Sequence, residues 1–187
     1  MGLILEKYKE EYKSHLTDLS KMISILLKDP CPDVKIKLSE FISKISIEYK
    51  HEIGVHSKGI IMSLCLNLKH QHNKIRKITE SSLIDILLCD NAGNFLDECI
   101  PYLKVLSNDK NTEVRKQFYN SISKLLENLN IVYLRKSEPA LVMLLLNGLS
   151  DDKEDIRNMT KKLIEDAGNN RRKLAFEIDE DLSKVLE

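Results

Sequence analysis

Apolar residues recur along the chain at the three- and four-residue intervals that are typical of amphipathic helices. They predict a first set of helices over residues 3–28, 56–69, 94–107 and 131–149 and a second set over residues 32–49, 73–89, 112–128 and 154–168. Glycine and proline are scarce and stand mostly between these segments, which favours long helices with short connections. Pro139 is expected to begin the well-ordered part of the helix over residues 131–149, because proline is tolerated in a first turn.

A similar polar turn separates the two helices of each successive pair. An apolar residue followed by a base stands at Val34-Lys35, Ile75-Arg76, Val114-Arg115 and Ile156-Arg157, at intervals of 41, 39 and 42 residues. An acid precedes the base by six positions at Asp29, Asp109 and Asp151, whereas His70 holds that place before Arg76, so Arg76 is expected to lack its acid. A period of about 40 residues indicates an array of stacked helical pairs.

One helical pair cannot bury its own apolar face, but stacked pairs form a continuous core. We therefore predict an all-α fold, a right-handed α-α superhelix (a solenoid) of four helical pairs in a single domain over residues 1–187. The repeats would cover roughly residues 3–50, 51–90, 91–129 and 130–170, followed by a C-terminal extension over residues 171–187. A globular bundle would give no reason for one turn at a fixed period.

Composition narrows the function classes. Lys and Arg number 29 and Asp and Glu number 29, and this zero net charge disfavours a dedicated nucleic-acid binder, although a locally basic groove remains an alternative. The four cysteines form no C-x-x-C pair, and Cys65 and Cys89 stand in apolar runs, so we expect reduced core thiols. The N-terminus lacks a secretory pattern and no apolar run approaches a membrane span of about 20 residues, so we expect a cytoplasmic protein.

The charged turn residues invite a catalytic interpretation that their spacing does not favour. Acid–base catalysis needs groups that converge on one pocket, whereas these residues recur once per repeat. We predict a structural ladder, in which each base reaches carboxylates or turn carbonyls of its own and neighbouring repeats: Asp29, Lys35, Arg76, Asp109, Arg115, Asp151 and Arg157. His70 and His72 lack a nearby third ligand, and no phosphate loop or nucleophile motif occurs. We therefore expect no enzyme, cofactor, metal or small-molecule substrate.

This pattern of turn acid and helix-start base resembles the HEAT repeat, whose second helices line a concave face. The resemblance implies a protein-binding surface on that face. Positions 2, 5, 6, 9 and 10 after each apolar anchor are expected to point outward there. The predicted partner-binding residues are Lys44, Lys77, Glu80, Lys116, Tyr119, Lys124, Lys161 and Lys162. Tyr119 is the expected anchor, because an exposed aromatic residue among charges suits a binding hot spot.

A closer resemblance lies in "LLKDPCPDVK", "KHQHNKIRK" and "LLLNGLSDDKEDIRNMTKKLIEDAGN", followed by the acidic "DEDLSKVLE". These stretches are similar to the family of HEAT-repeat axonemal dynein assembly factors, over most of the chain and most clearly in repeats two and four. The resemblance implies a cytoplasmic scaffold that helps dynein heavy and intermediate chains to assemble before transport, and whose partners are those chains or co-chaperones. Since those arrays are longer, it also implies a fragment or a shortened relative. The alternative is a generic HEAT scaffold in nuclear transport or phosphatase organisation.

Overall fold

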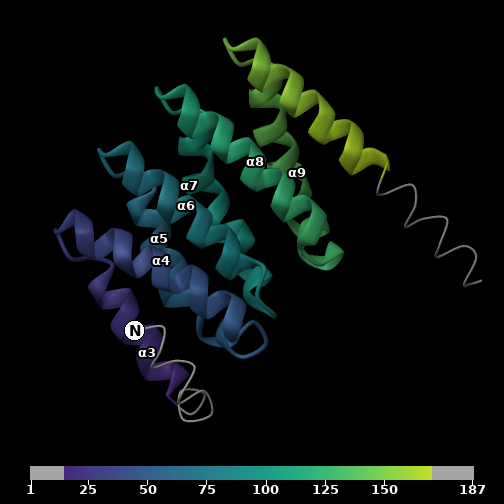
Figure 1. Cartoon of the computed structure of the whole chain (residues 1–187). Coiled ribbons are helices and arrows are strands. Elements are labelled where there is room, and N and C mark those ends of the chain that lie inside the picture. Colours follow the sequence, from purple (N-terminus) through teal and green to yellow (C-terminus); the bar gives the residue numbers. More distant parts are fainter. Residues whose placement is uncertain (1–14, 170–187) are drawn as a thin grey trace, which may run out of the picture.

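The computed structural model describes residues 15–169, which form helices and two short 3-10 turns without any strand (Figure 1). The elements are α3 (Leu16–Leu26), α4 (Pro32–Glu48), η1 (Ile53–His56), α5 (Lys58–Asn67), α6 (Asn73–Leu87), η2 (Ala92–Phe95), α7 (Leu96–Ser107), α8 (Thr112–Asn128) and α9 (Ile131–Leu149). A last helix covers residues 154–169. The first part of the helix expected over residues 3–28 and the extension over residues 171–187 lie outside the described residues.

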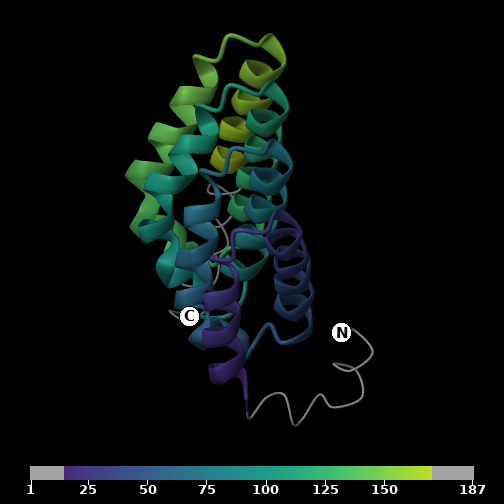
Figure 2. The same cartoon turned by 90° about the vertical axis from the view of Figure 1, so that its left-hand side faces the viewer.

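The helices form two layers. The first helices α3, α5, α7 and α9 pack on one another in chain order, and the second helices α4, α6 and α8 do the same (Figure 2). Each second helix lies beside the first helix of its own pair, and the last helix continues the second layer in Figure 1. This arrangement confirms the predicted all-α helical repeat solenoid. Of the helices described, none is both long and apolar enough to cross a lipid bilayer.

The repeated acid shapes the turn that contains it. The carboxylates of Asp29, Asp109 and Asp151 each accept a hydrogen bond from the backbone N–H two residues later, at 2.7, 2.8 and 2.9 Å. An aspartate that bonds its own backbone in this way mimics a backbone turn and competes with continued helix. The acid thus stabilises the turn that separates the first helix from the second helix.

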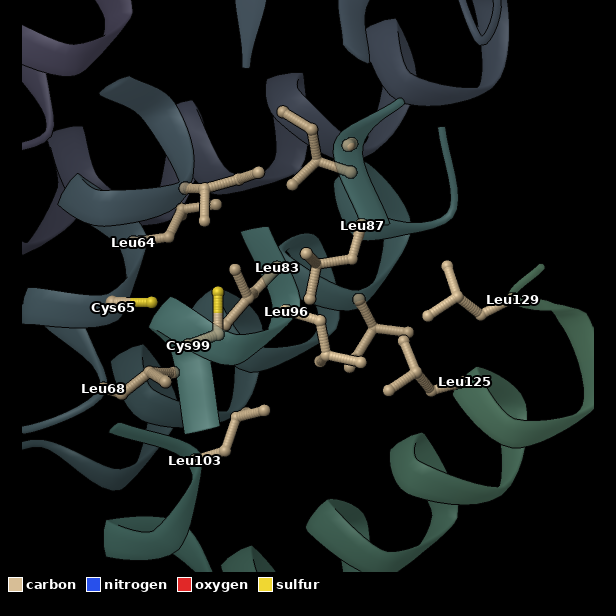
Figure 3. Close-up of a cluster of buried hydrophobic side chains, with 14 of the residues drawn as sticks. Leu64, Cys65, Leu68, Leu83, Leu87, Leu96, Cys99, Leu103, Leu125 and Leu129 are labelled. Atoms are coloured by element: carbon tan, nitrogen blue, oxygen red, sulfur yellow. The ribbon is translucent and has the colours of Figure 1, made fainter. Parts of the chain in front are cut away.

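Apolar side chains from successive repeats meet in one core. In Figure 3, Leu64 and Cys65 of α5 and Leu68, the residue after its end, lie near Leu83 of α6 and Cys99 of α7. Leu125 and Leu129 extend the same cluster toward the next repeat. Each fully buried Leu or Ile of this kind contributes about 1.5–3 kcal/mol relative to an exposed one. The stack is therefore stabilised mainly across repeat boundaries, as a solenoid requires.

Two features of the connections differ from the sequence expectations. The first is that α9 begins at Ile131 and runs through Pro139, whereas we expected its ordered part to start at Pro139. Proline removes the hydrogen bond to the carbonyl four residues earlier, which belongs to Arg135. Both residues are exposed, so water can satisfy that carbonyl and the helix continues.

The second difference is the pair of 3-10 turns η1 and η2, which the helical periodicity did not indicate. The connections that contain these turns touch one another, because the Asp90 N–H, before η2, donates to the Lys50 carbonyl, before η1, at 3.0 Å. A Cβ on Gly54 would lie 1.7 Å from the Asp90 carbonyl oxygen, so only glycine permits this approach. The two connections therefore belong to the packed body of the protein.

Candidate protein-interaction surface

The base of the third turn joins its own repeat to the next one. Arg115 donates from Nη1 to the Asp109 carbonyl at 2.8 Å, within its own turn. Its Nε and Nη2 donate to the two carboxylate oxygens of Asp151 at 2.7 and 2.9 Å, and Nη2 also reaches Asp152. The side chains of Arg115 and Asp151 are only 10% and 4% exposed. A bidentate, desolvated pair of this kind is stronger than an ordinary surface ion pair.

Arg76 makes the same bridge from the second repeat. It donates to the carbonyls of His70 and Gln71 at 2.8 and 3.0 Å, and its Nη2 donates to Asp109 at 3.0 Å. The expectation that Arg76 lacks an acid is therefore wrong. The carboxylate comes from the turn of the following repeat. The acid in each of these turns pairs with the base of the preceding repeat.

This one-repeat offset explains the first turn as well. The acid that would meet Lys35 stands at position 70, where the chain has His70. Lys35 Nζ instead donates to the Leu27 carbonyl at 2.8 Å and to Asn67 Oδ1 at 2.7 Å. Burial lowers the pKa of Lys35, and burial together with neighbouring positive charge lowers the pKa of His70. A neutral amide thus replaces the carboxylate at this boundary.

The two remaining ladder residues lie at its ends. Arg157 donates to the Asp151 carbonyl of its own turn at 2.7 Å. Asp29 closes the first turn through the Cys31 N–H. Burial opposes ionisation of Asp151, but hydrogen bonds from Arg115 and from the Lys153 N–H outweigh it and lower its pKa. All seven residues thus make hydrogen bonds within or between turns.

Two of the predicted partner-binding residues are not on the surface. The Tyr119 side chain is fully buried, its hydroxyl donates to the Leu144 carbonyl at 3.3 Å, and its ring lies against Gly148 of α9. Glu80 is also buried, and the Gln117 amide of α8 donates to its carboxylate. The expected exposure of both residues is therefore wrong. Position 5 lies one helical turn after the ladder base and faces the next repeat.

The environment of Glu80 changes its ionisation. Burial raises its pKa to about 7, although hydrogen bonds from Ser121 and Gln117 oppose this shift. The nearby Asp85 carboxylate raises the pKa further and Lys124 lowers it. The carboxyl group thus lies at the boundary between α6 and α8, and its pKa is higher than is usual for glutamate.

The other predicted residues are lysines on the surface formed by the second helices. Lys116 bonds Asp155 at 3.0 Å and Lys124 bonds Asp85 at 2.5 Å, so both pair with an acid of a neighbouring repeat. Lys77 is half-buried. Lys44, Lys161 and Lys162 are exposed, and within residues 15–169 none of these three has an ion-pair partner.

A groove between α6 and α8 was not predicted from the sequence. It is open, has a volume of about 600 Å³, and is lined by Asn73, Lys74, Lys77, Ile78, Ser81, Gln117 and Ser121. Gln117 fixes its position by donating to the Lys77 carbonyl at 2.6 Å. Of its lining residues only Lys77 was named from the sequence, because the others come from two helices about 40 positions apart and share no sequence pattern. Among the residues that the structure describes, no cluster of three or more potential metal ligands occurs.

A comparison with protein families gives a match to nearly the whole chain. A family model described as dynein axonemal assembly factor 5-like, TPR repeats, matches residues 1–183 and so covers nearly the whole chain. No curated protein and no solved structure matches the chain. The match therefore includes every described helix, both faces of the stack and the groove between α6 and α8.

Proposed function

Because the chain belongs to the dynein axonemal assembly factor 5-like repeat family, we propose that it acts as a non-catalytic scaffold in the cytoplasmic preassembly of axonemal dynein arms. Two features support this proposal. The stacked repeats supply an extended surface of the kind that solenoids use for binding proteins. The conspicuous charged residues of the turns are engaged in joining repeats, which leaves the second-helix surface for a partner.

The observation that carries the proposal is the open polar groove between α6 and α8. Asn73, Ser81 and Ser121 offer donors and acceptors that suit the main chain of a bound segment. Lys74 and Lys77 add positive charge on one side, which favours an acidic segment. We place an acidic stretch of a dynein heavy or intermediate chain, or of a co-chaperone, in this groove.

We retain six of the lysines named from the sequence as flanking contacts: Lys44, Lys77, Lys116, Lys124, Lys161 and Lys162. We also assign the repeats to the HEAT type, although the family description names TPR repeats. The intervals of 41, 39 and 42 residues exceed the roughly 34 residues of a TPR and approach the roughly 40–47 residues of HEAT and armadillo repeats.

The test is affinity capture from cells that are building motile cilia. The intact chain should enrich dynein heavy or intermediate chains, and the Lys74→Glu/Lys77→Glu variant should lose them. Lys153→Glu is the matched control, because Lys153 is exposed in a turn away from the groove. If the intact chain enriches no dynein chain, the dynein-specific function is wrong. If the groove variant captures as well as the control, the partner binds elsewhere on the scaffold.

The nucleic-acid alternative receives less support. Lys116 and Lys124 each pair with an acid of the neighbouring repeat, which interrupts any continuous basic track along the second helices. A phosphate-binding groove requires unpaired bases that release counterions, so its affinity must fall as salt rises. Undetectable binding to duplex DNA or RNA at low salt would remove this alternative.

A further inference from the structure

The first helices carry most of the exposed large apolar side chains within residues 15–169. These helices form the layer seen on the left in Figure 2. In the same part of the chain, the second helices expose only Ile47 and Ile164 among their large apolar residues. A concentration of exposed apolar side chains on one face marks a surface that contacts another molecule.

Three of these side chains form one row across the stack, which we call the apolar row. Ile25, Leu66 and Val105 each stand nine positions before the apolar anchor of their own turn. They are 68%, 56% and 37% exposed. The Ser63 hydroxyl donates to the Ser24 carbonyl at 3.1 Å, which holds α3 and α5 side by side at this level. The row therefore runs from one first helix to the next.

A second set of side chains widens the apolar row. Met62 and Pro101 stand four positions before Leu66 and Val105 and so lie on the same side of α5 and α7. Met143 holds the corresponding place in α9 and is 59% exposed. Methionine is flexible and recurs on protein surfaces that adapt to a bound helix. The apolar surface is thus two side chains wide and reaches from α3 to α9.

The charge on this side of the stack has one sign. The C-terminal parts of the first helices contain no acidic residue, over residues 22–28, 62–69, 101–108 and 139–150. Their bases are Lys28, Lys69 and Lys104, which are exposed and have no carboxylate partner within residues 15–169. Lys69 Nζ lies 5.2 Å from the centre of the Tyr102 ring, which holds its charge beside α7. The acids of the following turns already accept bonds from their own backbone. A partner with negative charge therefore complements this face.

The spacing of the apolar row favours a helix as the partner. Packed helices lie about 8–10 Å apart. Seven residues of an α-helix rise about 10.5 Å and return to nearly the same face. A helix that crosses α3, α5 and α7 can therefore place an apolar residue on each member of the row. Three residues of a β-strand cover about 10 Å as well, but they point to alternate faces.

We propose that the first helices bind an acidic amphipathic helix of a partner protein. The helix lies across α3, α5 and α7, with its apolar residues on the apolar row. Its acidic residues lie beside Lys28, Lys69 and Lys104. This surface is separate from the groove between α6 and α8, and the proposal does not depend on the role in dynein assembly.

Fluorescence anisotropy of a labelled peptide with the full-length chain tests the proposal. The probe has three heptads, with leucine at the first and fourth positions of each and glutamate at the positions beside them. A shuffled peptide of the same composition and a peptide with lysine in place of glutamate are the control probes. The acidic probe should bind the unmodified protein, and the two controls should bind at least tenfold more weakly.

Leu66→Glu should weaken binding of the acidic probe at least tenfold, because it places a charge in the middle of the apolar row. Ile47→Glu is the matched control, since Ile47 is 77% exposed on the other layer, and it should bind like the unmodified protein. Lys69→Glu should weaken binding several-fold, and high salt should reduce this difference. Lys153→Glu should have no effect. Urea unfolding of each variant shows whether it is folded.

Equal binding of the acidic probe to Leu66→Glu and Ile47→Glu would overturn the proposal, as would equal binding of the shuffled probe. A dimer of the unmodified protein that Leu66→Glu dissociates would also overturn it, because a second copy would then be the occupant. The same holds if the chain binds phosphatidylserine vesicles through Leu66 and binds no probe. The groove variant Lys74→Glu/Lys77→Glu should bind the probe normally, so this test and the capture test fail separately.

Discussion

Glu80 shows how a residue that looks like surface charge in the sequence can be part of an interface between repeats. Its side chain is 2% exposed, and it lies beside Gln117 of the next repeat. The spacing of apolar residues along α6 alone could not indicate that Glu80 is buried, because the residue that covers it belongs to another helix. The same reason applies to Tyr119, which α9 covers.

Replacing Glu80 by Gln should change how stability depends on pH. The unfolded chain ionises Glu80 near its ordinary pKa of 4.5, whereas the folded protein keeps the proton up to about pH 7. Since the folded state binds more protons between these values, this group makes stability fall as pH rises from about 4.5 to 7. Glu80→Gln should therefore be more stable than the unmodified protein at pH 8, by up to about 3 kcal/mol, with no such gain at pH 4.5.

Urea unfolding at pH 4.5, 6 and 8 measures this difference. Glu165→Gln is the matched control, because Glu165 is exposed and should show no pH-dependent gain. A constant difference between Glu80→Gln and the unmodified protein over this range would show that Glu80 is ionised in the fold.

Arg115→Ala should be strongly destabilising. The substitution removes the guanidinium donors of the buried Asp151 carboxylate and of the Asp109 carbonyl, although Asp151 keeps the bond from the Lys153 N–H. Breaking one partner of a buried pair leaves an uncompensated charge, and we expect a loss of about 2–4 kcal/mol in urea unfolding at pH 7. Lys116→Ala, on the same helix as Arg115, breaks a pair with the exposed Asp155 of the last helix and should cost much less. Equal losses would show that the ladder pair contributes no more than a surface pair.

At the scale of elements, the sequence predicts most of the fold. The second helices begin where the acid-containing turn ends, so α4, α6 and α8 were expected within about two residues of their observed limits. The limits of α9 were expected at residues 131–149, as observed, but its ordered part was expected to begin only at Pro139, because that residue is a strong local signal and the cap at Asn130 is a weak one. The short turns η1 and η2 were missed because they depend on packing against each other.

Asn130→Ala tests the observed start of α9. The Asn130 side chain accepts a hydrogen bond from the Val132 N–H at 2.9 Å, which satisfies one of the free amides of the first turn. Its loss should lower stability by about 1 kcal/mol, the usual cost of removing an N-cap. Asn120→Ala, at an exposed position within α8, should be neutral or slightly stabilising because alanine favours helix. If Asn130→Ala were neutral too, the ordered part of α9 would begin later in the chain.

At the scale of the whole molecule, each repeat is stabilised by its contacts with the neighbouring repeats. The continuous core, the connections that contain the 3-10 turns and the charged ladder all cross one boundary at a time. The sequence indicated the ladder residues, but it could not indicate which turn each base reaches. Two turns lie within reach of a long arginine side chain, and only the spacing of the stacked helices selects between them.

A double-mutant cycle tests that offset. Arg76 Nε lies 2.6 Å from an Asp109 carboxylate oxygen, and both side chains are mostly buried. Arg76→Ala and Asp109→Ala should therefore couple by about 1–3 kcal/mol when combined, since residues in one buried pair are not additive. Arg76→Ala and Asp151→Ala should be additive, because Asp151 pairs with Arg115 in the following repeat. The free energy of unfolding of each single and double variant is measured by urea unfolding at pH 7. Coupling of Arg76 to Asp151 but not to Asp109 would contradict the ladder. With this one-repeat offset, the loss of one ladder base removes its ion pair with one neighbouring repeat only, as expected of a quasi-one-dimensional stack.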